Sequence, residues 1–182
     1  MKFLSPNEAI RGCEDSRYLD QEENDCVVRA MALAFGFSYD EAHGFTRGIF
    51  KRQDGEVAYN FTRCMKTVIQ DSQTFFEGSI KQFKVKKGLC AGQMQKLYPN
   101  NTFLVGIEGH VSIYCCGTWI DYEDLVFRDS VIEELYIIEN AAHLDELKGK
   151  LVRPEKFWSD PWLYAVVIGT LLLLYFLDKT YF

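Results

Sequence analysis

Residues 25–36, Asp-Cys-Val-Val-Arg-Ala-Met-Ala-Leu-Ala-Phe-Gly, form the stretch that decides the fold. Asp25 is a residue type that begins helices, the residues after it are good helix formers, and Gly36 is a residue type that ends one. We therefore expect a helix whose first turn contains Cys26. The dipole and the amide groups of a helix start stabilise a thiolate, so Cys26 is a candidate nucleophile.

Around this helix, the pattern changes from helical to extended along the chain. Ser38 and Glu41 form a capping box that opens a second helix. Beyond Pro99 the residues become β-rich, and Gly109 and Gly117 mark tight turns of an antiparallel meander. Helices followed by an antiparallel sheet predict an α+β domain. The other expected elements are helices at 61–69 and 89–97, strands at 82–86, 102–107, 110–115 and 118–121, and a strand or a helix at 131–138.

Composition narrows the class of protein. A chain of 182 residues that is 48% hydrophobic suits one ordinary core. The net charge of -6 argues against a nucleic-acid partner, because phosphate binding requires a surplus of Lys and Arg. Six cysteines without a Cys-x-x-Cys pair, together with three scattered histidines, argue for free thiols and against a metal site. The sequence also contains no phosphate-binding glycine motif, so we expect no cofactor.

The C-terminal segment has the composition of a membrane anchor. Residues 162–177, WLYAVVIGTLLLLYFL, carry no charge and are flanked by interfacial aromatic residues. We expect an α+β domain at 1–147, a linker at 148–160 and a transmembrane helix at 161–182. Four basic residues precede this segment closely and only Lys179 follows it, which predicts a cytoplasmic N-terminal domain, or the side of insertion if the membrane belongs to a virion. The alternative is a buried C-terminal core helix.

A base and an orienting carboxylate for Cys26 are present later in the chain. His110 begins a predicted strand, and Asp121 lies on the neighbouring strand of the hairpin. A tight turn at Cys116-Gly117 brings these two side chains to nearby cross-strand positions, where a carboxylate can orient an imidazole. Taken singly, each has a simpler explanation: a small buried cysteine, a core histidine and a surface carboxylate.

The order of these motifs resembles a known family. The stretch Gln21-Glu-Glu-Asn-Asp-Cys26 before a helix, then Gly109-His110, and then Gly117-Thr-Trp-Ile-Asp121, is similar to papain-like cysteine peptidases. Within them it most resembles the double-glycine, bacteriocin-processing peptidases and related bacteriophage proteins. The resemblance covers roughly residues 20–125 and implies a papain-like fold.

The resemblance also implies roles for individual residues. Cys26 would be the nucleophile, His110 the general base and acid, and Asp121 the residue that orients the imidazole. Gln21 would donate a hydrogen bond to the oxyanion beside the backbone N–H of Cys26, and Asn24 is the alternative donor. We expect the other five cysteines to be structural.

These expectations lead to three functional hypotheses. The first is a membrane-anchored cysteine hydrolase, with a bacteriophage as one candidate source, that cleaves a peptide or isopeptide bond in a peptide or protein through a thioester. The second is a virion or membrane structural or genome-delivery protein with an inactive peptidase fold and assembly partners. The third is an entry enzyme that cleaves peptidoglycan. In all of them His43 is expected to face solvent and His143 to lie in a charged surface segment.

Overall fold

A computed structural model of the chain describes residues 1–18, 22, 24–53, 61–74 and 76–151. The chain divides into two units, Met1–Leu151 and Val152–Phe182, and every described residue belongs to the first unit. Among these residues, no helix has the length and apolar character needed to cross a bilayer. The predicted anchor at 161–182 lies outside the described residues, as does most of the predicted linker. Helix α6 (Ala142–Leu151) continues into the range at 148–160 where the linker was expected.

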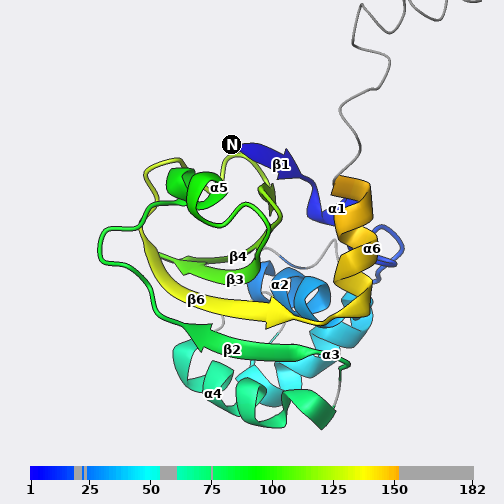
Figure 1. Cartoon of the computed structure of the whole chain (residues 1–182). Coiled ribbons are helices and arrows are strands. Elements are labelled where there is room, and N and C mark those ends of the chain that lie inside the picture. The colour runs from blue at the N-terminus through cyan, green and yellow to red at the C-terminus, as the bar shows by residue number, and fades with distance from the viewer. Residues whose placement is uncertain (19–21, 23, 54–60, 75, 152–182) are drawn as a thin grey trace, which may run out of the picture. The chain divides into compact units, whose positions relative to one another are not determined.

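The described residues form an α+β fold around one six-stranded sheet, in the order β1-β5-β4-β3-β6-β2 (Figure 1). The antiparallel meander predicted at 102–121 is present, but the sheet as a whole is mixed rather than antiparallel, because β1 pairs in parallel with β5, Lys2 opposite Thr118. The range at 131–138, left open between strand and helix, is a strand. The strands are β1 (Lys2–Leu4), β2 (Ser79–Phe83), β3 (Thr102–Ile107), β4 (His110–Cys115), β5 (Thr118–Ile120) and β6 (Ile132–Glu139).

The two best-marked helices begin and end where the sequence predicts. Gly36 ends the first of them with a φ of 71°, a left-handed conformation that favours glycine. Ser38 and Glu41 form the predicted capping box of the second. The predicted helix at 89–97 is instead a 3-10 turn (Ala91–Gln93) followed by a short α5. The helices not yet given are α1 (Pro6–Ala9), α2 (Cys26–Phe35), α3 (Tyr39–Phe50), α4 (Phe61–Asp71) and α5 (Met94–Leu97).

Both faces of the sheet are covered, so its central strand is buried throughout. Along β3, Leu104 packs with the apolar face of α2, whereas Phe103 and Val105 point to the opposite face. On that opposite face, residues 89–94 close a second core around Trp119. Each fully buried large apolar side chain contributes about 1.5–3 kcal/mol. The sheet is therefore a rigid support for side chains at its edge.

This architecture brings three distant segments together. Helix α2 packs against β4, and the first residues of these two elements are Cys26 and His110. Strand β5 pairs with β4, with Ile120 opposite Ile113, and Asp121 follows β5 directly. The ends of α2, β4 and β5 therefore meet at one corner of the domain.

Candidate active site

Cys26 is the first residue of α2, and its side chain is half-buried. The residue before it does not cap the helix through its side chain, contrary to the sequence prediction. The Asp25 carboxylate instead accepts hydrogen bonds from Arg29 Nε at 2.5 Å and from the Tyr39 hydroxyl at 2.6 Å. The amides of the first turn of α2 are thus not bound by Asp25, and Cys26 lies at the positive end of the helix dipole.

The structure brings together the three residues predicted to act as a unit. The Nε2 atom of His110 lies 2.7 Å from Oδ2 of Asp121, and the backbone N–H of Tyr122 donates to Oδ1 of the same carboxylate at 2.8 Å. Cys26 lies beside His110, and the two residues line the same two cavities. Because Asp121 engages Nε2, the ring nitrogen that remains for the thiol is Nδ1.

The surroundings of His110 favour its charged form. Burial by itself lowers the pKa of His110, but the hydrogen bonds and charges of Asp121 and Cys26 outweigh burial and raise the pKa to about 9. The side chain is 14% exposed, and that of Asp121 is 6% exposed. At neutral pH the site therefore contains an imidazolium, which can stabilise a thiolate and donate a proton.

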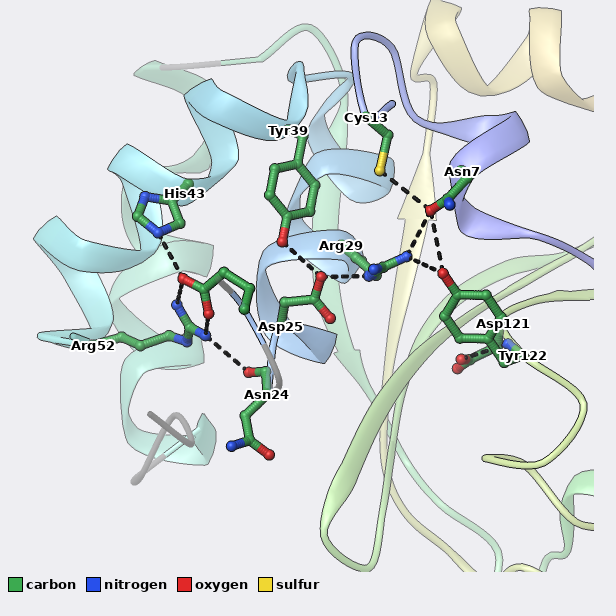
Figure 2. A network of polar contacts seen from close by, with 11 residues as sticks. Asn7, Cys13, Asn24, Asp25, Arg29, Tyr39, His43, Arg52, Asp121 and Tyr122 are labelled. Carbon is green, nitrogen blue, oxygen red and sulfur yellow. Dashed lines mark hydrogen bonds and ion pairs between the residues drawn. The ribbon is translucent and has the colours of Figure 1, made fainter. Parts of the chain in front are cut away.

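Arg29 is a central residue of the site that the sequence analysis missed. Its Nη1 atom donates to Asn7 Oδ1 at 2.9 Å and to the Tyr122 hydroxyl at 2.6 Å, while its Nε binds Asp25 (Figure 2). It thereby links the residue before Cys26 to the residue after Asp121. A single arginine in an otherwise apolar helix is the sequence signal that could have identified it, since a buried charge needs partners.

A second polar network holds the segment before Cys26. Glu22 accepts hydrogen bonds from both Nη atoms of Arg52, and one of its oxygens lies 2.8 Å from His43 Nε2. Arg52 Nη2 also donates to the backbone carbonyl of Asn24 at 3.0 Å (Figure 2). The prediction that His43 faces solvent is wrong: it is 1% exposed and its ring stacks on Tyr18.

Of the predicted oxyanion donors, the structure describes Asn24 and the backbone N–H of Cys26 but not Gln21. Gln21 lies outside the described residues, so its role stays a prediction. Asn24 is exposed on the segment that leads into α2, with its carbonyl held by Arg52. The backbone N–H of Cys26, at the start of α2, is the donor that the fold itself supplies.

A cleft opens beside the thiol. A cavity of about 190 Å³ is lined by Cys26 and His110, by the start of α4 at Phe61 and Thr62, and by residues of β3 and β6. A second, much smaller hollow of about 30 Å³ lies where Cys26, His110 and Asp121 meet Arg29. The thiol is therefore reachable from a space large enough for a few atoms of a polypeptide backbone.

The remaining candidate ligands are dispersed. Within the described ranges, no three His, Cys, Asp or Glu side chains are grouped so as to hold a metal ion. All six cysteines are free thiols. His143, expected in a charged surface segment, is half-buried, and its Nε2 lies 3.1 Å from the carbonyl oxygen of Leu33 at the end of α2.

Comparisons with protein-family models, with curated proteins and with solved structures find no match to this chain. The resemblance of its motifs to papain-like peptidases therefore stays a prediction. The chemical interpretation rests on the contacts among Cys26, His110 and Asp121.

Proposed function

We propose that this protein is a cysteine hydrolase of papain-like type that cleaves a peptide or isopeptide bond. One observation carries the proposal: His110 binds the Asp121 carboxylate through one ring nitrogen and lies beside Cys26, the first residue of a helix, where both residues line the same two cavities. A thiol, a base and an orienting group in contact are the requirements of nucleophilic catalysis by cysteine.

The proposed reaction has two halves. The Cys26 thiolate attacks the carbonyl carbon and forms a C–S bond, while the carbonyl electron pair moves to the oxygen, which the Cys26 N–H can stabilise. Collapse of this intermediate expels the amine, which takes the proton of the His110 imidazolium and leaves a thioester. Water then attacks the thioester as the neutral imidazole accepts its proton. Expulsion of the Cys26 thiolate releases a carboxylic acid and restores the ion pair.

The chemistry of alkylation tests this proposal without knowledge of the substrate. Full-length protein is treated with iodoacetamide at pH 7, and the rate of modification of each cysteine is followed by mass spectrometry. We expect Cys26 to react about tenfold faster than an ordinary thiol, because it lies at the positive end of α2 beside the His110 ring. Cys90 and Cys116, which are half-buried thiols outside the two cavities that Cys26 and His110 line, are the internal references.

Replacement of the thiol provides the matched control. In a Cys26→Ala variant, the fast phase of alkylation should disappear while the reference cysteines react as before. Equal rates for Cys26 and the references would contradict the proposal. That result would favour the structural or genome-delivery role, in which the same fold does no chemistry.

We further propose that residues 161–182 anchor the enzyme to a membrane, with the N-terminal domain on the cytoplasmic or insertion side. The support is the uncharged run at 162–177 and the basic residues before it. Extraction of membranes with alkaline carbonate tests the anchor: an integral protein stays in the pellet, whereas release of the full-length chain would contradict this part of the proposal.

A further inference from the structure

Large apolar side chains are exposed beside the candidate active site. Leu125, Phe127 and Val131 are 42%, 58% and 54% exposed, and they line one groove of about 370 Å³. The only comparable side chain elsewhere in the described ranges is Leu97, at 47%. Contiguous apolar surface of this kind marks an interaction site more often than isolated exposed residues do. We call this hollow the Phe127 groove.

The backbone under the Phe127 groove is held in place. The backbone N–H of Phe127 donates to Ser130 Oγ at 3.0 Å, and the N–H of Ser130 donates to the Phe127 carbonyl at 3.1 Å. Ala91 donates to the Ser130 carbonyl at 2.9 Å, and the side chain of Val126 is buried in the core. The apolar side chains are thus presented to solvent by an ordered loop, which lowers the entropy lost when a partner binds.

The charged residues that line the Phe127 groove are all acidic. Glu108, Asp129 and Glu133 line it, and none of its lining residues is Lys or Arg. The neighbouring Arg128 does not line the groove, and the carbon atoms of its side chain lie against Gly92. An acidic surface with apolar side chains complements a partner that carries both basic and apolar side chains.

The Phe127 groove shares lining residues with both of the cavities beside the Cys26 thiol. Leu125 also lines the small hollow where Cys26 meets His110, and Glu133 also lines the larger cleft beside Cys26. Glu133 reaches both spaces because of a β-bulge: Gly106 pairs with Glu134 and Ile107 with Ile132, so Glu133 is the extra residue of β6. A polypeptide lying in the groove would pass its next residues across the thiol.

We propose that the Phe127 groove binds the substrate polypeptide next to the cleaved bond, through a stretch that combines basic and apolar side chains. This inference rests on the proposed hydrolase function and specifies its substrate class. Apolar side chains of the substrate pack on Phe127 and Val131, and its Lys or Arg side chains lie near Glu108, Asp129 and Glu133. The groove therefore selects against acidic substrates.

Photocrosslinking tests this assignment in the full-length Cys26→Ala protein, kept in a zwitterionic detergent. The probe is the peptide Lys-Leu-Lys-Val-Lys-Leu with an N-terminal benzophenone, and its analogue carries Glu in place of each Lys. We expect crosslinks to the Lys peptide within residues 107–133, about fivefold more than to the Glu peptide. Phe127→Ser should reduce them about tenfold, whereas Leu97→Ser, an equally exposed apolar residue outside the groove, should not.

Three outcomes would overturn the assignment. Crosslinks that scatter outside the groove, or equal yields from the Lys and Glu peptides, would show that this surface does not select the substrate. A Phe127→Ser protein that changes from dimer to monomer in analytical ultracentrifugation would show that a second copy occupies the groove. None of these readouts needs the thiol, and alkylation of Cys26 by a small reagent needs no groove, so the two proposals fail separately.

Discussion

Within the described residues, a part-buried pair and a buried pair of a histidine and a carboxylate differ in what surrounds them. His110 lies 2.7 Å from Asp121, and His43 lies 2.8 Å from Glu22, so the two contacts have nearly the same length. His110 also lies beside the Cys26 thiol and lines a cleft together with it. His43 is stacked on Tyr18, and its carboxylate partner is shared with Arg52 in a completely buried ion pair.

This difference separates the pair proposed to react from the pair that has a structural role. A histidine can transfer protons only if it reaches both a reacting group and solvent or substrate. His110 meets that condition, since its side chain is 14% exposed and that of His43 is 1% exposed. The pair of His43 and Glu22 instead fixes the segment that leads into Cys26. Contact between a histidine and a carboxylate is therefore not by itself the mark of an active site.

Substitution of His110 and of His43 should give the largest difference, because one change affects hydrolysis and the other affects stability. His110→Gln keeps a polar side chain but removes the group that transfers protons, so we expect hydrolysis of a peptide substrate to fall about a thousandfold. His43→Gln should lower the midpoint of urea unfolding and leave the rate of hydrolysis per folded molecule within about threefold. Rates are measured on the folded fraction, determined by circular dichroism.

Either of two results would contradict the distinction between a catalytic His110 and a structural His43. Equal losses of hydrolysis in the two variants would mean that His43 also takes part in the reaction. Unchanged hydrolysis in His110→Gln would remove His110 from the mechanism, while Asp121→Asn serves as a second test of the same pair.

Local sequence patterns were sufficient to predict the parts of the site that depend on helix ends and hairpins. The start of α2 at Cys26 was predicted correctly, although the Asp25 side chain does not cap the helix, and the contact of His110 with Asp121 follows from the tight turn at Gly117. Fixed spacing and known turn geometry determine these positions.

Long-range partners could not be predicted in the same way. Arg29 and Arg52 bind groups that are up to 93 residues away, and no periodicity encodes such a contact. Strand β1 has only three residues, too few to show an alternating pattern, and it pairs with β5 far along the chain. The buried position of His43 likewise depends on Glu22 and Tyr18, which lie outside its own helix.

The buried ion pair of Arg52 and Glu22, whose carboxylate also contacts His43, should have the next largest effect, on stability. Arg52→Met removes the cation that donates two hydrogen bonds to the buried Glu22 carboxylate, so we expect the free energy of unfolding to fall by about 4 kcal/mol. Arg11→Met is the matched control, because the pair of Arg11 and Glu41 is exposed and should contribute almost nothing. Urea unfolding of the three proteins measures the difference. Similar losses for the two variants would show that burial does not distinguish these pairs.

The pH dependence of stability should show the smallest effect, and it concerns His110. The pKa of His110 is about 9 in the folded protein and 6.5 in a histidine without partners, so the folded state binds the proton more tightly. The resulting stabilisation is complete below pH 6.5 and is lost as the pH rises through 9. It amounts to about 3 kcal/mol.

Urea unfolding of the wild-type protein and of His110→Gln is measured at pH 6 and at pH 10. The stability that the wild-type protein loses between these pH values in excess of the variant's loss is the contribution of His110, because other groups that titrate in this window contribute equally to both proteins. A wild-type protein that loses no more stability than the variant would mean that Asp121 and Cys26 do not hold His110 in its charged form. The imidazolium needed to expel the amine would then be absent at neutral pH, and the reaction would have to begin from a neutral thiol and a neutral imidazole. Retention of the difference in His43→Gln would assign the titration to His110 and keep the two histidine pairs distinct.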